Sequence, residues 1–287
     1  MDISLIAVPY HLGRPGAGAA SGPDRILRAV SERGLELPRS RVALSLPFAN
    51  EVAATMNVNT ELAGIVAHDL AAHRTPVTIA ADCISCIGTL AGMNATLSTA
   101  PAARTLRTGV VWLDAHGDFN TANSSPTGYL DGMALASATG LDWGTMTASV
   151  PGFRPVHSPN VLHLGGRDFD PGEFDRLQDA GVELMSASAV SFVTPDFERA
   201  LGSLADRVDA VYLHVDLDVL DPSEGTANAY SATGGLTGSE LLAVVRACLA
   251  KLPVHTVALT AYDPDFDRPG SVAAIAAQSI EALTALA

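Results

Sequence analysis

Short apolar runs alternate with longer segments of mixed polarity along this chain. The runs have the length of β-strands and fall at positions 3–8, 42–46, 77–80, 109–113, 161–164, 211–215 and 254–259. Several of the intervening segments open with Ser, Asp, Pro or Thr, as helices usually do, and helices are expected at 22–30, 61–73, 171–181, 195–207, 238–252 and 271–287. This alternation predicts an α/β fold with a parallel sheet covered on both faces.

The composition is typical of one large soluble unit. With 287 residues and 48% hydrophobic side chains, the chain can bury one large core, and no linker or repeat interrupts it, so a single domain over 1–287 is expected. A net charge of −14 argues against nucleic acid or an anionic membrane as partner, since either needs a basic face. The absence of a long apolar stretch and of a signal-peptide pattern predicts a cytoplasmic protein.

The cysteines fit a reducing compartment. Cys83, Cys86 and Cys248 are too few and too unevenly spaced for a disulfide framework. Cys83 and Cys86 match a Cys-x-x-Cys pattern, but no short βαβ domain surrounds them as it would in a thioredoxin-like protein.

The run 109–113 ends in two carboxylates and an imidazole, those of Asp114, His116 and Asp118. In parallel sheets, ligands bind beyond the carboxyl ends of the strands, and these three side chains are all metal ligands. The polar segment 120–132 follows directly and, like the Gly- and Ala-rich segment 10–23, is expected to form a wall of the site. The alternative is that both segments are ordinary surface loops.

A second cluster follows the run 211–215. Strand side chains alternate between faces, so His214, Asp216 and Asp218 are expected on one face. Two ionised carboxylates on a buried strand repel each other unless a cation lies between them. Each cluster alone could be an acidic loop edge, but two clusters at the ends of apolar strands predict a metal centre.

The two clusters carry a family resemblance. Asp114-Ala-His-x-Asp118 and Asp216-x-Asp218-x-x-Asp221-Pro resemble the signature motifs of the ureohydrolases, the family of arginase, agmatinase and formimidoylglutamase. Other segments extend the resemblance along nearly the whole chain: 18–23 is similar to the family's Gly-rich loop, 81–83 to its Gly-Asp-His segment and 262–264 to its Asn-Pro segment. The resemblance implies a three-layer α/β/α sandwich around a mostly parallel eight-stranded sheet, and a hydrolase of linear amidines.

The resemblance also implies two Mn²⁺ ions, since hard carboxylates with a few nitrogens suit manganese. One ion would be held by Cys83, Asp114, Asp118 and Asp216, and the other by Asp114, His116, Asp216 and Asp218. Two neighbouring ions can hold a bridging water as hydroxide, which would attack the planar guanidine carbon. Asp118 would orient this nucleophile and return its proton.

Position 83 departs from the family pattern, because Cys83 replaces a metal-binding histidine. A thiolate prefers zinc or iron, so the ion beside Cys83 is expected to bind weakly or to differ in identity. His214 could substitute as a ligand, although the more conservative interpretation is that it hydrogen-bonds a ligand. A further alternative is an inert buried Cys83 beside a single metal.

Substrate-binding residues follow from the same resemblance. Asn120, Ser125 and Thr127 occupy the positions that hold the substrate α-carboxylate in arginase, and Asp170 and Glu173 occupy those that recognise the α-amino group. Because residues for both the α-carboxylate and the α-amino group are present, the substrate is expected to be an α-amino acid rather than agmatine. Asp170 could instead cap a helix.

At the guanidine end of the substrate site, two residues that are typical of the family are replaced. The glutamate that holds the guanidinium falls at Ala261, and the histidine that shuttles protons in arginase falls at Asp131. Loss of a buried carboxylate disfavours a charged guanidinium, whereas an N-hydroxyguanidine is less basic. A branch of the family that forms L-ornithine and hydroxyurea from Nω-hydroxy-L-arginine in D-cycloserine biosynthesis also carries a cysteine at the first ligand position. The chain resembles this branch, with Asp131 and His214 as candidate proton donors to the leaving group.

Other functions stay open at this point. The chain could be an arginase, agmatinase or formimidoylglutamase proper, or a single-metal amide hydrolase, since deacetylases share the fold. It could also be an inactive ureohydrolase that binds amino acids or a partner subunit. A small amino-acid substrate is the expected partner, and a homo-oligomer is possible.

Overall fold

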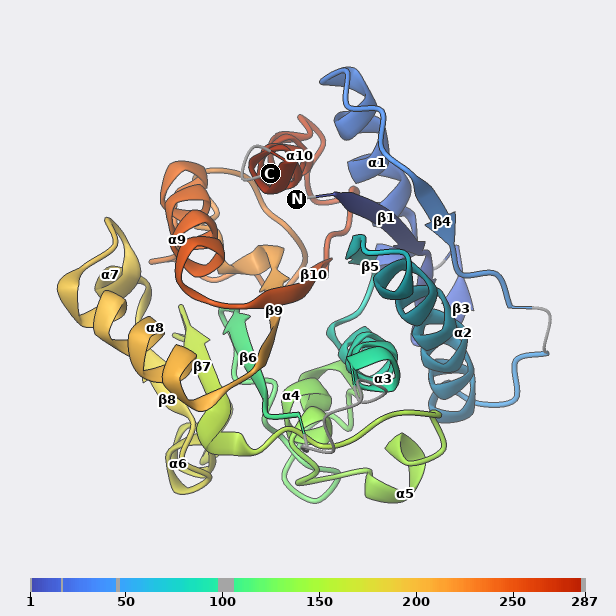
Figure 1. Cartoon of the computed structure of the whole chain (residues 1–287), viewed down its shortest axis with the longest axis horizontal. Coiled ribbons are helices and arrows are strands. Elements are labelled where there is room, and N and C mark those ends of the chain that lie inside the picture. Colours follow the sequence, from blue (N-terminus) through green and yellow to red (C-terminus); the bar gives the residue numbers. More distant parts are fainter. Residues whose placement is uncertain (1, 17, 45–46, 98–105, 285–287) are drawn as a thin grey trace.

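The structure, a computed structural model, describes residues 2–16, 18–44, 47–97 and 106–284. An eight-stranded sheet crosses it, and the strand pairs of this sheet are parallel (Figure 1). In order across the sheet the strands are β4 (Arg39–Arg41), β1 (Ile3–Val8), β5 (Thr75–Ala80), β10 (Val254–Thr260), β9 (Ala210–Asp216), β6 (Thr108–Leu113), β7 (Val161–Leu164) and β8 (Glu183–Met185). A separate hairpin pairs β2 (Tyr10–His11) with β3 (Arg14–Pro15).

Helices cover both faces of the sheet. One layer contains α1 (Gly22–Glu32), α8 (Pro195–Arg207), α9 (Gly238–Lys251) and α10 (Ser271–Thr284). The other contains α2 (Glu51–Ala71), α3 (Cys86–Leu97) and α4 (Ala134–Ala138). The remaining helices are α5 (Gly144–Thr147), α6 (Glu173–Asp179), α7 (Ala187–Val190) and the short 3-10 turns η1 (Gly18–Ser21), η2 (Cys83–Ser85), η3 (Asp131–Met133), η4 (Ser158–Asn160) and η5 (Leu217–Val219).

The central strands are buried on both faces, which explains their continuous apolar runs. In β6, Val111 and Leu113 pack against the α8, α9 and α10 layer, whereas Val110 and Trp112 belong to the core beneath α3 and α4. The predicted three-layer α/β/α sandwich is therefore confirmed.

Several elements differ from the sequence prediction, among them two helices and two strands. Helix α2 begins at Glu51 rather than at position 61, with Asn50 accepting a hydrogen bond from the Ala53 N–H. A strand was expected at 42–46, but β4 lies at Arg39–Arg41, and positions 45–46 lie outside the described residues. Strand β8 and helix α3 were not predicted: β8 is three half-buried residues, and α3 is buried around most of its circumference, so it lacks a polar face.

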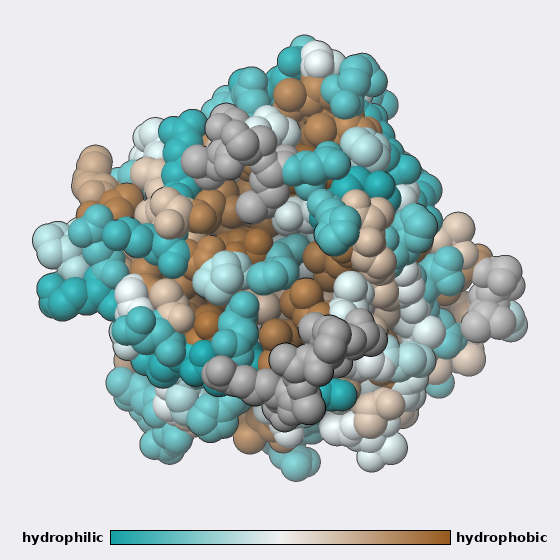
Figure 2. Space-filling model, viewed as in Figure 1, coloured by the Kyte–Doolittle hydropathy of each residue, from teal (hydrophilic) through white to brown (hydrophobic). Residues whose placement is uncertain are grey.

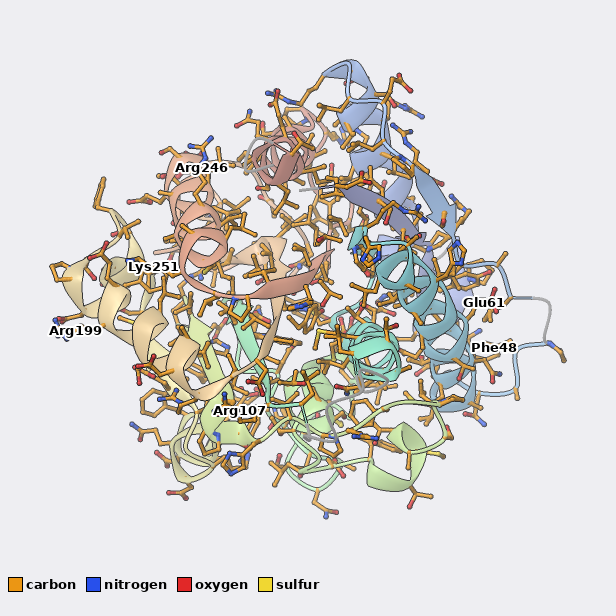
Figure 3. All side chains as sticks on the ribbon, in the orientation of Figure 1. Phe48, Glu61, Arg107, Arg199, Arg246 and Lys251 are labelled. Carbon is orange, nitrogen blue, oxygen red and sulfur yellow. The ribbon has the colours of Figure 1, made fainter. Side chains whose placement is uncertain are left out.

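The outer faces of the helices are polar. Exposed Glu61 on α2, Arg199 on α8, and Arg246 and Lys251 on α9 are labelled in Figure 3. Figure 2 shows hydrophilic residues around the periphery of the face in view and apolar residues nearer its centre. Among the described helices, none combines the length and apolar composition needed to cross a membrane.

Candidate active site

The acidic clusters meet at the carboxyl edge of the sheet. Cys83 follows β5, the segment from Asp114 to Asp118 follows β6, and Asp216 ends β9. Strand β10 lies between β5 and β9, and β9 pairs directly with β6. Central parallel strands therefore bring together side chains that lie more than a hundred positions apart in sequence.

The side chains form two overlapping groups of potential metal ligands. Cys83, Asp114 and Asp216 place one ligand atom each within 4.8 Å of one another, and so do Asp114, His116 and Asp218. Asp114 is common to both groups, as a bridging ligand would be. His116 Nδ1 lies 3.2 Å from Asp218 Oδ2 and 3.5 Å from Asp114 Oδ1.

Hydrogen bonds fix the orientation of the carboxylates. The N–H of His116 donates to Asp114 Oδ1 at 2.7 Å, and the N–H of Asp218 donates to Asp216 Oδ1 at 2.8 Å. Trp112 Nε1 donates to Asp114 Oδ2 at 2.9 Å. Because the groups are held before any ligand arrives, the edge is preorganised.

The strand alternation expected through Asp218 stops earlier than predicted. Strand β9 ends at Asp216, and Asp218 lies in η5. The carboxylate of Asp216 accepts the Asp218 N–H and closes this turn, which brings Asp218 toward His116.

The electrostatics fit a divalent cation. Burial, followed by the charge of Asp218, raises the pKa of Asp114 to about 6. Burial and neighbouring carboxylates also raise the pKa of Asp118 and Asp216 well above the ordinary range. Among the described residues, none donates a hydrogen bond to the buried Oδ2 of Asp118. Buried carboxylates of this kind require a cation or a proton, so the donor set suits metal ions.

Asp118 lies outside both compact groups, although the resemblance implies that it is a ligand. Its backbone is left-handed, with a φ of 49°, and its carbonyl accepts the N–H groups of Leu135 and Ala136 at the start of α4. This geometry aims the segment after β6 toward α4 and leaves Asp118 buried beside the cluster.

Cys83 connects His214 to the cluster. The Cys83 thiol donates to Asp216 Oδ2 at 2.9 Å and lies 3.1 Å from Thr260 Oγ1, which is 3.2 Å from His214 Nε2. His214 Nδ1 contacts the Tyr212 hydroxyl at 2.7 Å, and the imidazole stacks on Trp112. Fully buried His214 thus reaches the cluster through Thr260 and Cys83 and through Trp112, and it belongs to neither ligand group.

The cysteines lack the chemistry of a redox pair. Cys83, Cys86 and Cys248 are free and buried. Burial raises the pKa of the Cys83 and Cys86 thiols well above the ordinary range, whereas reactive Cys-x-x-Cys thiols have lowered values. The thioredoxin-like interpretation is therefore not supported.

Asp131 is held against the loop that carries Cys83. Its Oδ1 accepts the Ile84 N–H at 2.8 Å, and burial together with the nearby Asp82 raises its pKa well above the ordinary range. Asp131 is 7% exposed, so a proton on this carboxyl is sheltered from solvent.

The two predicted substrate loops are joined to each other. Asn120 Nδ2 donates to Asp170 Oδ2 at 2.7 Å, and Asn120 Oδ1 accepts from Arg176. Buried Glu173 accepts the Phe119 N–H at 2.8 Å and the Asp170 N–H at 3.0 Å. Helix α6 starts at Glu173 without a side-chain cap, so the alternative role of Asp170 as a helix cap is wrong.

The outer part of the loop is more exposed. Ser125 Oγ accepts the Gly128 N–H, and Thr127 Oγ1 accepts the Tyr129 N–H. The Tyr129 ring lies 5.9 Å from the ring of Tyr230, which meets the edge of His116 at 6.3 Å. These tyrosines form an aromatic rim over the metal-ligand cluster that the sequence analysis missed.

Two further contacts were also missed. Asn228 Nδ2 donates to Asp218 Oδ2 at 3.2 Å and to the Ala261 carbonyl at 2.9 Å. His11 Nδ1 lies 2.6 Å from Asp82 Oδ1. Neither Asn228 nor His11 belongs to a signature motif, although His11 lies in the segment 10–23 that was expected to form a wall of the site.

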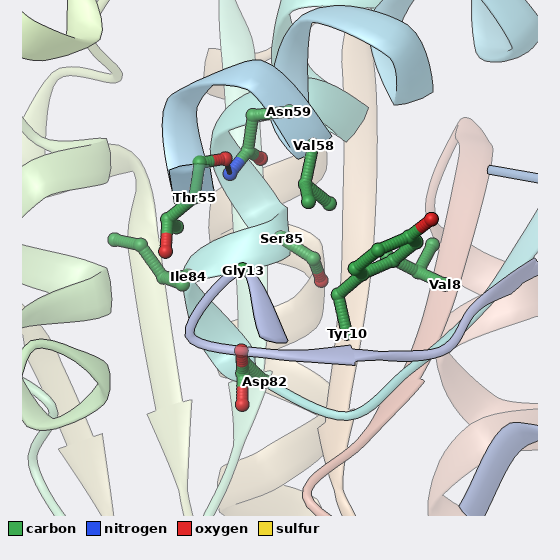
Figure 4. Close-up of a pocket in the computed structure, with 9 residues that line it drawn as sticks. All are labelled: Val8, Tyr10, Gly13, Thr55, Val58, Asn59, Asp82, Ile84 and Ser85. Atoms are coloured by element: carbon green, nitrogen blue, oxygen red, sulfur yellow. Dashed lines mark hydrogen bonds between the residues drawn. The ribbon is translucent and has the colours of Figure 1, made fainter. Parts of the chain in front are cut away.

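Two cavities are not lined by any residue of the two metal-ligand groups. A cavity of about 10 Å³ lies between the loop after β1 and α2, where the hydroxyls of Thr55 and Ser85 have no partner among the described residues (Figure 4). It has room for about one water molecule. A larger pocket of about 460 Å³ lies beside Thr108 and Asn160, at the amino ends of β6 and β7 and away from the carboxylates.

Comparison with known proteins identifies the family. A sequence profile of the arginase family matches residues 1–285. The chain belongs to the arginase family. The arginase of Bacillus caldovelox is 32% identical to this arginase-family chain over 256 residues, which cover 83% of each protein. The crystal structure of the arginase from that organism has a TM-score of 0.84 at 28% identity and covers 98% of this chain and 97% of its own.

A second relative is closer over a shorter stretch. The N(omega)-hydroxy-L-arginine amidinohydrolase of Streptomyces lavendulae is 38% identical to this arginase-family chain over 144 residues, 50% of this chain and 47% of the relative. The ureohydrolase resemblance is thus confirmed, and the chain is a hydrolase of guanidino C–N bonds in a family with a binuclear metal centre.

Proposed function

We propose that this arginase-family hydrolase converts Nω-hydroxy-L-arginine into L-ornithine and hydroxyurea. The observation that carries the proposal is the loss of the family's guanidinium-binding carboxylate at Ala261. The Ala261 carbonyl accepts the Asn228 amide, which also donates to Asp218. No carboxylate side chain stands at position 261 to hold a charged guanidinium, whereas the less basic N-hydroxyguanidine does not need one.

We infer two Mn²⁺ ions as cofactors. One would be held by Cys83, Asp114, Asp118 and Asp216, and the other by Asp114, His116, Asp216 and Asp218. Such ions lower the pKa of bound water toward neutrality and so supply a hydroxide nucleophile. The orphaned Oδ2 of Asp118 is suited to orient the attacking water and to take its proton.

The remaining residues would bind and orient the substrate. Asn120, Ser125 and Thr127 would contact its α-carboxylate. Asp170 would contact the α-amino group, with Glu173 holding the two loops together. The rings of Tyr129 and Tyr230 would border the planar guanidine group, which favours a flat ligand. We also infer a cytoplasmic enzyme, with no nucleic acid or membrane partner, that can form homo-oligomers.

Arginase activity is the second candidate. The full-length relatives named as arginases and the presence of both amino-acid loops favour it. It requires Asn228 and the aromatic rim to replace the missing carboxylate at position 261 in holding a charged guanidinium.

A substrate panel separates the candidates. Arginine, Nω-hydroxy-L-arginine, agmatine, guanidinobutyrate and formimidoylglutamate are incubated with the protein and Mn²⁺, and the release of urea, hydroxyurea or formamide is measured. The proposal expects the highest kcat/KM with Nω-hydroxy-L-arginine. A higher kcat/KM with arginine would establish the arginase alternative instead.

A further inference from the structure

His11 and Asp82 form an oriented pair beside the candidate metal centre. His11 Nδ1 lies 2.6 Å from Asp82 Oδ1, while Asp82 Oδ2 accepts the Leu12 N–H at 2.6 Å. Asp82 is almost completely buried, and Figure 4 shows it beside the loop that carries Tyr10 and Gly13. A buried carboxylate with both oxygens engaged fixes the imidazole through Nδ1 and leaves Nε2 available.

The fold places this pair at the same edge as the metal-ligand cluster. His11 follows β1 and Asp82 follows β5, its direct neighbour in the sheet. Asp82 is adjacent in sequence to Cys83. The His11 side chain is 27% exposed, and its ring lies 6.2 Å from Tyr129 of the aromatic rim. The imidazole therefore lies beside the aromatic rim, at the same sheet edge as the candidate metal centre.

The other imidazoles at this edge are committed elsewhere. His116 is a candidate ligand, and His163 Nε2 contacts the His116 carbonyl at 2.7 Å within the core. His214 is fully buried between Tyr212 and Thr260. Apart from the candidate ligand His116, His11 is thus the partly exposed imidazole of this edge among the described residues.

We propose that His11 is a catalytic residue that gives its Nε2 proton to the leaving nitrogen of the substrate, with Asp82 as its positioning residue. The proposal rests on the guanidine hydrolysis proposed above. In that reaction a C–O bond forms between water and the guanidine carbon, and the C–N bond to the ornithine side chain breaks. The departing nitrogen takes the bond's electron pair and the His11 proton, and a proton lost by the attacking water restores the imidazole.

Charged groups on three neighbouring segments favour the protonated ring. The hydrogen bond with Asp82 raises the pKa of His11, burial lowers it, and the charges of Asp82, Asp131 and Asp263 raise it further. Tyr129 is the titratable residue facing the ring from the loop after β6, and burial raises its pKa, so it stays neutral. His11 is therefore protonated to a higher pH than a free imidazole, and kcat/KM is expected to fall as the pH rises through its raised pKa.

The test compares His11→Ala, His11→Asn and Asp82→Asn with the wild type, on Nω-hydroxy-L-arginine and arginine with Mn²⁺. Loss of the acid is expected to lower kcat about 10²- to 10⁴-fold in both His11 variants with little change in KM. The alkaline fall of kcat/KM should disappear in them, and added imidazole should restore turnover in His11→Ala. In Asp82→Asn the alkaline fall should move to lower pH.

His68→Ala is the matched control, because His68 is exposed on α2, and its kinetics should equal those of the wild type. Wild-type kcat and pH profile in His11→Asn would overturn the proposal, as would a loss of activity in His11→Ala that imidazole does not restore although the variant melts like the wild type. If His11→Ala does not fold, the pH profile of His11→Asn decides. If the wild type hydrolyses no guanidine of the panel, the proposed function itself is overturned. The wild type alone gives this result, so it is distinguishable from a failure of the His11 proposal.

Discussion

Cys83 makes the two sides of the candidate metal centre chemically different. Its thiol donates to Asp216, and burial and the surrounding carboxylates raise its pKa well above the ordinary range. A metal ion on this side has to displace that proton, whereas His116 offers an imidazole on the other side. Manganese also prefers oxygen and nitrogen to sulfur, so the side beside Cys83 is expected to bind Mn²⁺ more weakly.

Replacing Cys83 by histidine should strengthen metal binding on this side of the centre. Cys83→His is expected to increase Mn²⁺ affinity about 10- to 100-fold, the scale on which changes around a metal site act. It should also raise turnover of arginine relative to Nω-hydroxy-L-arginine. Isothermal titration with Mn²⁺ and the substrate panel measure both effects, with Cys248→Ser, a buried thiol in α9, as control. Unchanged Mn²⁺ affinity in Cys83→His would show that position 83 does not contact the metals.

Asp114 belongs to both groups of potential metal ligands, and Asp216 belongs to one of them. Loss of the charge of either residue should therefore affect metal binding. Asp114→Asn and Asp216→Asn are each expected to lower kcat at least about 10²- to 10³-fold, because each removes a charge that holds the ions in place. Exposed Asp168, which lies 4.0 Å from His116, provides the control Asp168→Asn. Turnover near the wild-type value in Asp114→Asn would refute its assignment as a bridging ligand.

At the scale of elements, the segments after β6 and β7 act as one unit. Glu173, at the start of α6, accepts N–H groups from Phe119 and Asp170, so it ties the predicted α-carboxylate and α-amino loops together. Gly117 lies against this carboxylate, since a Cβ at position 117 would come within 2.6 Å of Glu173 Cδ. The spacing between the loops therefore depends on the absence of a side chain there.

Gly117→Ala should displace Glu173 and loosen both loops. We expect a loss of about 1–3 kcal/mol in the free energy of unfolding, the usual effect of overpacking, together with a higher KM. Urea unfolding and steady-state kinetics measure the two quantities. Gly64→Ala on α2, where a Cβ would meet nothing within 4 Å, should be neutral or slightly stabilising. A Gly117→Ala variant with wild-type stability and KM would contradict the link between the loops.

Sequence patterns predicted the elements that have a strong local signal. The central strands and α8 were found because apolar runs and helix starts are local, and the acidic clusters lie directly at strand ends. Helix α3 has no polar face, and β8 has no apolar run, so neither stands out. The segment 10–23 was expected as a wall of the site, but the pairing of His11 with Asp82 and the places of Asn228 and Thr260 depend on strand order, which a single sequence does not display.

At the scale of the whole molecule, the acidic edge opposes folding unless cations are bound. Burial raises the pKa of Asp114 from 3.8 to about 6 and raises that of Asp118 and Asp216 further above the ordinary range. Each carboxyl binds a proton more tightly in the folded chain than in the unfolded chain. The unfavourable contribution is thus absent below the unfolded pKa and grows as the pH rises through the folded values.

Metal-free protein should therefore be less stable at pH 7.5 than at pH 5.5. Thermal unfolding with a chelator and with Mn²⁺ should give two curves whose separation widens as the pH rises. At a Mn²⁺ concentration of about 100 times Kd, binding adds about 2.7 kcal/mol. Asp114→Asn should raise the melting temperature of the chelated protein at pH 7.5. Equal melting temperatures of the chelated wild type at both pH values would refute this account.

The strand order has a consequence for synthesis of the chain. Strands β4, β1 and β5 pair among themselves, and so do β6, β7 and β8, but the two sets are joined only by β9 and β10. Cys83 belongs to the first set, and Asp114, His116 and Asp118 to the second. A nascent chain that has left the ribosome only as far as α8 holds Cys83, Asp114 and His116, but it lacks Asp216, Asp218 and the strands that unite the two sets. Metal ions are therefore expected to bind only late in synthesis, after β9 and β10 have joined the two sets of strands.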